Sequence, residues 1–257
     1  MKNFQIKTGF ISFYYTCRQT LPSFLKRKTT AEAVLFGKPF RVSKGIKEFI
    51  ECREQIVEKD QYHTALIKPN DFVIDAGANA GVFSVFVAAK HPNTTIYAFE
   101  PTPETFSNLK ENTKYYKNIH AFNDALGETE KRAIFVINPN SSESNRVEEN
   151  NYITQNGFLR AMYRTFKLLA CDIRVKIKTI DSLNIRCDFL KMDTEGYEVN
   201  ILKGATKTIK KWKPIIAMSA YHKPNDKKEL PLLLNSIAPY KCELFHDAEE
   251  DFICKPL

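Results

Sequence analysis

The stretch of residues 71–101 constrains the fold of this chain more than any other. A short apolar run ends there at Asp75 and breaks into a turn with two glycines, after which residues 82–90 have the apolar spacing of a helix. A second apolar run, residues 95–99, closes on Glu100 and then on a proline, which cannot donate a hydrogen bond to a sheet. Two strands joined by a helix predict a βαβ unit with parallel strands.

The turn of this unit is suited to a ligand that approaches the backbone closely. Gly77 and Gly81 carry no Cβ atom and accept positive φ angles. Glu100, at the end of the second strand, is placed to accept hydrogen bonds from the two hydroxyls of a ribose. The spacing differs from G-x-G-x-x-G, and Asn79 occupies the place where a pyrophosphate would contact bare backbone. The pattern favours a nucleoside without phosphates over the alternative of a tight turn beside a solvated glutamate.

Length and charge limit what the rest of the chain can be. With 257 residues, 43% of them hydrophobic, the chain can form one sizeable core, so we expect one catalytic domain with appendages. Its net charge of +8 and pI of about 9.0 favour anionic partners, namely nucleic acid, an acidic membrane surface, or a phosphorylated or acidic glycan. The six cysteines form no C-x-x-C pair, which predicts reduced structural thiols.

Residues 1–60 are expected to form a partly helical extension, followed by the catalytic domain over 61–257. Aromatic residues and the basic run Lys26–Lys28 are typical of a segment that lies on an anionic membrane surface or, more often, packs across the catalytic domain. Residues 48–59 have the apolar spacing of a helix. The longest uncharged stretch near the N-terminus is too short to span a bilayer, so we expect a cytoplasmic protein that could contact a membrane surface through residues 1–28.

The remainder of the chain continues the alternation of strands and helices. Its periodicity predicts strands at 119–125, 189–192, 215–218, 241–245 and 251–255, and helices at 103–116, 197–211 and 227–236. Together with the βαβ unit, these elements make a doubly wound, mostly parallel α/β sheet of seven strands. Residues 132–138 and 174–180 alternate as strands of an antiparallel insertion, and residues 139–172 between them are typical of a lid that binds the substrate.

Two pairs of segments match a known group of enzymes. DAGANAGVFS with FEPTPETFSNLKEN, and DFLKMDTEGYEVNILKGA with KPIIAMSAYHKPND, resemble the FkbM family of S-adenosylmethionine (SAM)-dependent O-methyltransferases. The resemblance covers residues 71–236 without the lid, and the acidic tail at 246–251 departs from the family pattern. It implies a class I methyltransferase fold, SAM as the cofactor, and methyl transfer to hydroxyls of sugars or other secondary metabolites.

The resemblance also assigns roles to individual residues. Four residues of the glycine turn would line the methionine end of SAM, namely Asp75, Gly77, Asn79 and Gly81. Glu100 would hold the ribose, and Asp124, after the third strand, could accept a hydrogen bond from the adenine amino group or could be an ordinary turn residue. Asp193 and Glu195 follow the fourth strand, where the activated methyl group should point.

His222 is the candidate general base. Methyl transfer from a sulfonium depends mainly on the position of the acceptor oxygen, and a base should add a factor of about 10² to 10⁴. The strand before His222 should lie beside the one that ends at Asp193, so the imidazole could face this carboxylate across the crevice. Alternatively, His222 is a surface residue, or it holds a divalent metal together with Asp193 and Glu195. The favoured hypothesis has no metal.

Three other functions compete with this hypothesis. Methyltransferases of nucleic-acid bases resemble one another in an Asn/Asp-Pro-Pro-aromatic motif, whereas this chain has DTEG at that place. An NAD-dependent oxidoreductase is disfavoured by the missing G-x-G-x-x-G. A non-catalytic, membrane-associated SAM-binding protein is supported only by residues 1–28. We therefore expect a small-molecule or glycan acceptor, which could be anionic, and no nucleic-acid partner.

Overall fold

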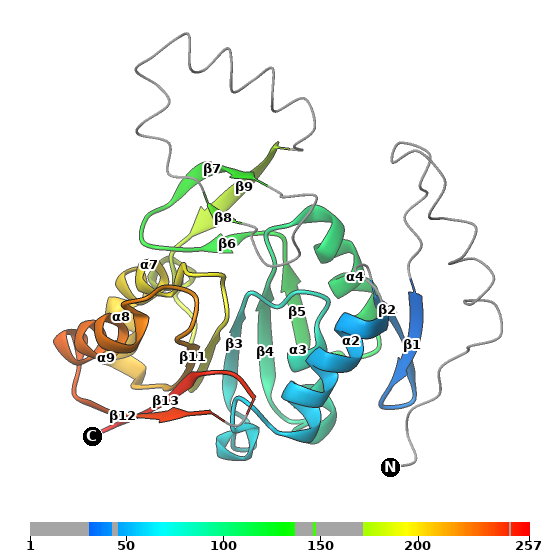
Figure 1. Ribbon diagram of the computed structural model, residues 1–257, viewed down its shortest axis with the longest axis horizontal. Helices are drawn as coiled ribbons and strands as arrows, with labels where there is room; N and C mark the ends of the chain where they lie inside the picture. Colours follow the sequence, from blue (N-terminus) through cyan, green and yellow to red (C-terminus); the bar gives the residue numbers. More distant parts are fainter. Residues whose placement is uncertain (1–30, 43–45, 137–145, 148–171, 247) are drawn as a thin grey trace, which may run out of the picture.

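A seven-stranded sheet forms the centre of the protein (Figure 1). The computed structural model describes residues 31–42, 46–136, 146–147, 172–246 and 248–257. In spatial order the strands are β12 (Tyr240–Phe245), β13 (Asp251–Pro256), β11 (Ile215–Ser219), β10 (Phe189–Met192), β3 (Phe72–Ala76), β4 (Thr95–Phe99) and β5 (Ile119–Phe122). The strands from β11 to β5 are parallel, and β13 is antiparallel to both of its neighbours. The predicted doubly wound, mostly parallel sheet is confirmed.

The order of the strands reverses between β3 and β10. From β3 the chain moves outward to β4 and β5, and it then returns to the other side of β3 to form β10 and β11. Lys191 of β10 lies opposite Asp75 of β3, and the two strands end at the same level. In open α/β sheets, ligands bind in the crevice at the carboxyl ends of the strands where the order reverses. The topology therefore places a binding site beyond the ends of β3 and β10.

Helices cover both faces of the sheet because successive residues of each parallel strand point to opposite faces. Val73 and Phe189 pack on the face covered by α2 and α3, whereas Ile74 and Leu190 pack on the face covered by α7, α8 and α9. The helices are α2 (Ile46–Arg53), α3 (Val82–Lys90), α4 (Pro103–Thr113), α6 (Ile180–Leu183), α7 (Glu198–Lys203), α8 (Thr206–Trp212) and α9 (Asp226–Ile237). Burial on both faces explains why these strands appear in the sequence as short continuous apolar runs.

Two predicted boundaries are wrong. The helix expected over 197–211 is divided into α7 and α8 around Gly204, where a Cβ atom would collide with the backbone carbonyl of Gly127. The strand expected over 119–125 ends at Phe122, because the residues that follow it leave the central sheet and pair elsewhere. Both differences arise from contacts between segments distant in sequence, which local periodicity does not encode.

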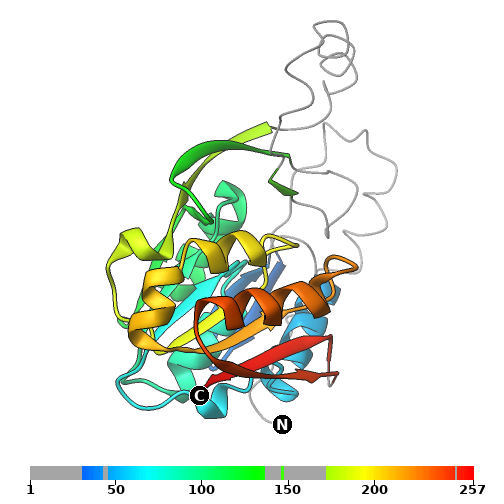
Figure 2. The same ribbon diagram turned by 90° about the vertical axis from the view of Figure 1, so that its left-hand side faces the viewer.

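A second, smaller sheet stands above α7 and the carboxyl end of the central sheet (Figure 1 and Figure 2). Its strands, in spatial order, are β6 (Ala125–Leu126), β9 (Asp172–Lys178), β7 (Lys131–Val136) and β8 (Arg146–Val147). β7 and β9 are antiparallel, which confirms the predicted insertion. Apart from residues 146–147 and 172, the predicted lid over 139–172 lies outside the described residues.

The N-terminal part of the described chain packs onto the α3 side of the sheet. It contains a hairpin of β1 (Ala31–Leu35) and β2 (Lys38–Val42), then α2, a π-helical turn η2 (Glu54–Glu58) and a 3₁₀ turn η3 (Thr64–Leu66). Phe40 and Phe49 share one core with Val73 and Phe83, so residues on both sides of position 60 are packed together. Residues 1–28 lie outside the described part. Within the described residues, we find no helix with the length and apolar character that a membrane span requires.

The expectation that the cysteines are all reduced is wrong for one pair. Cys242 and Cys254 form a disulfide with a Cα–Cα distance of 4.0 Å. The two residues lie directly opposite each other on the antiparallel strands β12 and β13. The sequence did not reveal the pair because the register of these strands depends on tertiary packing. Cys187 is free and buried, as expected of a small core residue.

Candidate active site

The turn between β3 and α3 forms one wall of a cavity at the reversal point. Gly77, Asn79 and Gly81 have φ angles of +75°, +49° and +96°. Gly77 and Asn79 line the cavity, and Gly81 does not. A Cβ atom on Gly77 would collide with the backbone carbonyl of Asp193. The glycine is therefore needed because the turn lies directly against the end of β10.

Glu100 is fixed at the end of β4 with its carboxylate beside this turn. One carboxylate oxygen accepts a hydrogen bond from the Asn79 backbone N–H at 3.1 Å, and the other accepts from the Thr102 N–H at 2.8 Å. The residue is only 7% exposed and lines the cavity. These two bonds orient Glu100, whose carboxylate is thus held at the wall of the cavity.

Asp75 and Lys191 form a buried ion pair behind the turn. The Asp75 side chain is fully buried, accepts from the Ser84 hydroxyl at 2.6 Å, and lies 3.1 Å from Lys191 Nζ. Lys191 Nζ also donates to the carbonyl oxygen of Gly77 at 2.9 Å. Burial alone would lower the pKa of Lys191, but Asp75 and Asp193 raise it above its usual value. Lys191 lines the cavity, whereas Asp75 is placed to hold the lysine and the turn.

Asp193 projects into the cavity from the end of β10, and two side chains hold it. Its Oδ2 accepts a hydrogen bond from the Tyr62 hydroxyl at 3.0 Å, and its Oδ1 lies 3.5 Å from His222 Nε2. Tyr62 is 1% exposed and packs edge-on against Phe83. The Asp193 side chain keeps 29% exposure, so this carboxylate is restrained and still open to the cavity.

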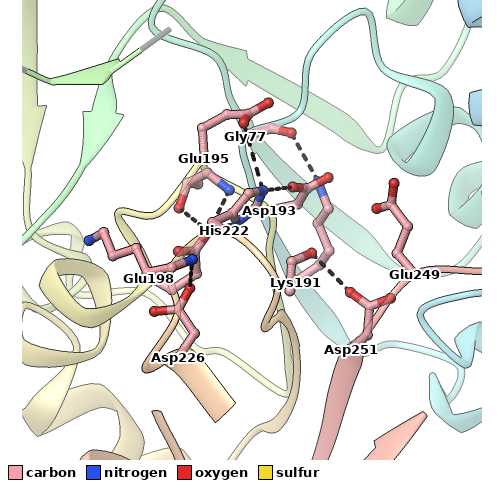
Figure 3. Close-up of polar contacts among 12 residues, drawn as sticks. Gly77, Lys191, Asp193, Glu195, Glu198, His222, Asp226, Glu249 and Asp251 are labelled. Atoms are coloured by element: carbon pink, nitrogen blue, oxygen red, sulfur yellow. Dashed lines mark hydrogen bonds and ion pairs between the residues drawn. The ribbon is translucent and has the colours of Figure 1, made fainter. Parts of the chain in front are cut away.

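His222 lies among three carboxylates (Figure 3). Its Nδ1 is 3.2 Å from the buried Glu198, and its Nε2 is 3.7 Å from Glu195 in addition to the contact with Asp193. Burial alone would lower the pKa of His222, but Glu198, Asp193 and Glu195 raise it to about 9. At neutral pH the side chain is therefore an imidazolium. His222 lies close to Asp193, as expected, and its imidazole is positively charged.

The turn after Asp193 is held in an unusual backbone conformation. Glu195 and Gly196 have φ angles of +56° and +90°. A side chain such as that of glutamate is strained at this angle, and such strain is found mainly at functional sites. The turn is fixed by Glu198, which accepts hydrogen bonds from the backbone N–H and the hydroxyl of Thr194 at 2.8 and 3.0 Å. This geometry directs Glu195 to the cavity, which it lines together with Asp193.

Asp124 lies at the far end of the cavity, just beyond β5. It is 9% exposed and forms an ion pair of 2.9 Å with Lys178 of β9. The pair connects the cavity to the small sheet. The structure thus brings all the predicted site residues to one end of the central sheet. Gly77, Asn79, Glu100, Asp124, Asp193 and Glu195 line the cavity, whereas Asp75, Gly81 and His222 lie behind its lining.

Several residues of the site carry no recognisable signal in the sequence. Tyr62 lies in a segment without a motif, and Phe49, Cys52 and Ile56 of α2 and η2 close the cavity from the N-terminal side. Lys191 could have been found, because it stands two residues before Asp193 on a strand and so points to the same side. Among the described residues, no three His, Cys, Asp or Glu side chains are arranged to hold a metal ion.

Comparisons with known proteins agree with this geometry. The model of the methyltransferase FkbM domain matches residues 75–250. The chain is 28% identical to Methyltransferase 1 of Beauveria bassiana, over 61% of this chain and 66% of that protein, and 25% identical to the hexuronic acid methyltransferase AglP of Haloferax volcanii, over 81% and 80%. The match thus spans slightly under two thirds of the length of the Beauveria protein.

A solved structure shows the same fold. Methyltransferase FkbM from Methylobacillus flagellatus superposes with a TM-score of 0.53 and 20% identity, over 79% of this chain and 52% of that one. The residues around the cavity suit SAM, since the turn after β3 borders the cavity at Gly77 and Asn79, and the Glu100 carboxylate lines the same cavity, where it is placed for a pair of hydroxyls. The family match over most of the sequence, together with this site, shows that the chain belongs to the FkbM family of SAM-dependent methyltransferases.

Proposed function

We propose that this methyltransferase transfers the methyl group of SAM to a hydroxyl of a sugar, a glycan or another secondary-metabolite acceptor. The observation that carries the proposal is the Asp193 carboxylate, which is open to the cavity and held by Tyr62 and His222. An alcohol needs an acceptor for its proton as the new C–O bond forms, and an oriented carboxylate supplies one. The relative AglP is named for a sugar acid, which supports a carbohydrate acceptor.

SAM supplies the electrophilic methyl group on its sulfonium. Gly77 and Asn79 would lie along the methionine part, Glu100 would accept from the ribose hydroxyls, and Asp124 would accept from the adenine amino group. These assignments follow the positions of the residues along the cavity, from Asp193 at one end to Asp124 at the other. Lys191 supports the cofactor wall because its ammonium group holds the carbonyl of Gly77 and the carboxylate of Asp75.

Asp193 takes the role of general base, and His222 acts on it from behind. A base must be deprotonated at the working pH, whereas the pKa of His222 is about 9. The imidazolium instead balances Asp193, Glu195 and Glu198, which would otherwise repel one another. The cation thus holds Asp193 oriented toward the acceptor. His222 is a positioning residue in this scheme.

The test is methyl transfer to defined acceptors. Purified full-length protein is incubated with SAM that carries an isotopically labelled methyl group and with a panel of neutral and acidic oligosaccharides. We expect a labelled methyl ether, identified by mass spectrometry and by the NMR shift of the O-methyl carbon. Transfer to nitrogen or carbon only, or SAM binding without transfer to any hydroxyl of the panel, would contradict the proposal.

A further inference from the structure

The small sheet carries positive charges that face each other across its strands. Arg132 of β7 lies directly opposite Lys176 of β9. Both side chains are exposed, and residues directly opposite each other in an antiparallel pair lie on the same face. Like charges in this position destabilise a sheet. The arrangement therefore has a cost in stability that calls for a function.

The same face continues along β9. Side chains alternate between the two faces of a strand, so Arg174, Lys176 and Lys178 point to one side. Val175 and Ile177 point to the other side and are buried. Val175 and Ile177 are thus buried on one face of β9, and the opposite face carries a set of cations that we call the basic row: Arg132, Arg174, Lys176 and Lys178.

The basic row begins at the cavity. Lys178, its first member, forms the 2.9 Å ion pair with Asp124, which lines the cavity. Successive residues on one face of a strand are about 7 Å apart, so Lys176 and Arg174 follow at intervals of that size. Figure 1 shows that β9 rises away from the central sheet. The row therefore extends outward from the active site as a line of positive charge.

Among the described residues, the outer cations of the row have no carboxylate partner. Within the described residues, no carboxylate forms an ion pair with Arg132, Arg174 or Lys176, whereas Lys203 on α7 is paired with Glu128. The lining of the cavity, in contrast, contains the carboxylates of Asp193, Glu195 and Glu48 besides Lys191. An elongated acceptor would thus meet carboxylates at the reacting end and cations along the small sheet.

We propose that the basic row binds the carboxylates of an acidic oligosaccharide acceptor, one of whose hydroxyls reaches Asp193. The inference rests on the proposed function and names its acceptor class. Arginine and lysine pair with carboxylates, and Arg does so through two parallel hydrogen bonds. Cations spaced along a strand suit a chain with charges at intervals. A phosphate site would instead gather backbone N–H groups and charges around one point.

The test compares a charge-removal variant with a matched control. Full-length wild-type protein, the variant Arg132→Gln/Arg174→Gln/Lys176→Gln, and the control Lys207→Gln/Lys210→Gln/Lys211→Gln, whose lysines are exposed on α8, are titrated with hexagalacturonate in the presence of S-adenosylhomocysteine. We expect the wild type and the control to bind alike, and the row variant to bind about tenfold more weakly. The wild-type affinity should fall with salt. Neutral maltohexaose should bind equally weakly to all three proteins.

A second readout guards against a structural explanation. Because the Arg132–Lys176 pair is repulsive, its removal should leave the melting temperature unchanged or raise it. A loss of binding accompanied by a lower melting temperature would mean that the row is structural, which overturns the inference. Equal loss in the α8 control, or hexagalacturonate binding no tighter than maltohexaose, would overturn it as well.

Two further probes separate the inference from its rivals. Tighter binding of tripolyphosphate or of a single-stranded RNA than of hexagalacturonate would assign the row to phosphates and overturn the carboxylate proposal. Calorimetry with SAM is run on the same preparations. A wild type that fails to bind SAM would contradict the proposed function, whereas normal SAM binding with unaltered hexagalacturonate binding in the row variant would contradict only the basic row.

Discussion

The two halves of the active site are built in different ways. The half proposed to bind the cofactor consists of the turn after β3 and the ends of β4 and β5, with Gly77 and Asn79 in the turn and Glu100 hydrogen-bonded to its backbone. The acceptor half gathers Tyr62, Asp193 and other side chains from segments far apart in the sequence. The backbone conformation of the turn determines the geometry of the first half. Tertiary packing brings together the charged side chains of the second half. Substitutions should therefore affect the two halves differently.

Asp193→Asn should produce the largest effect and confine it to the acceptor half. The amide keeps the shape of the carboxylate and can still accept from Tyr62, but it cannot take a proton. We expect the turnover rate to fall by about 10² to 10⁴, with the dissociation constant for SAM nearly unchanged. Steady-state kinetics and calorimetry measure the two quantities.

The control for this variant is Asp188→Asn, which changes the residue just before β10, at its other end. Asp188 accepts from the Phe72 backbone at 2.8 Å and is outside the cavity lining. It should alter stability slightly and leave turnover intact. If Asp193→Asn retained full turnover, the proton would leave by another route, and the distinction between the two halves would lose its chemical basis.

Glu100→Ala should produce the next largest effect, in the cofactor half. The carboxylate would accept from the ribose, so its loss removes hydrogen bonds to a charged group, worth about 1.5 to 3 kcal/mol. That corresponds to SAM binding weakened by about ten- to hundredfold. Calorimetry measures it, and Glu111→Ala on the exposed side of α4 is the control. A folded Glu100→Ala variant with wild-type affinity would remove Glu100 from the cofactor site.

Tyr62→Phe sharpens the comparison because Tyr62 contacts Asp193 of the acceptor half but lies outside every sequence motif. The substitution deletes only the hydroxyl that donates to Asp193, and the ring can still pack on Phe83. Loss of one hydrogen bond of about 1 to 2 kcal/mol to a charged acceptor should lower turnover about tenfold, with SAM affinity intact.

Tyr240→Phe is the matched control, since its buried hydroxyl donates to the Pro214 carbonyl at 2.8 Å, outside the cavity lining. Both variants lose one buried hydrogen bond, so both should lose similar stability. Only Tyr62→Phe should lower turnover. Equal turnover in the two variants would show that Tyr62 has a structural role alone.

The contrast between the halves also explains what the sequence could predict. The glycine turn, Glu100 and the succession of strands and helices along the chain follow from local patterns, and the fold class was predicted from them. The close approach of His222 to Asp193 followed from topology, because strands β10 and β11 are neighbours. Tyr62 and the disulfide between Cys242 and Cys254 depend on packing and register between distant segments, and no local pattern marks them.

The positive charge of His222 at neutral pH could not be predicted from the sequence, whereas its position beside Asp193 could. The sequence predicts that the imidazole faces Asp193, but the structure surrounds it with Asp193, Glu195 and the buried Glu198. Glu198 stands three residues after Glu195, and its inward direction depends on the strained turn between them. The number of charges around one side chain is a tertiary property, and here it is the basis for proposing that His222 positions Asp193 as a cation.

The pH dependence of activity gives the smallest effect and the finest test. Glu198 from α7, Asp193 and Glu195 from the turn after β10, and Asp226 from α9 surround His222. Its pKa of about 9 exceeds the unfolded value of 6.5. The ion pairs of the imidazolium therefore stabilise the fold fully below pH 6.5, and this contribution is lost as the pH rises through 9.

If His222 positions Asp193, wild-type turnover should be level between about pH 7 and 8 and should decline as the imidazolium loses its proton near pH 9. A histidine base would give the opposite slope, with turnover rising toward pH 9 and then levelling. His222→Gln should lower turnover at pH 7 by roughly fivefold, the effect of about 1 kcal/mol, and should abolish the decline near pH 9. His120→Gln on β5 is the control. A rate that rises through pH 9 in the wild type and is lost in His222→Gln would restore His222 as the base and leave Asp193 as its orienting partner.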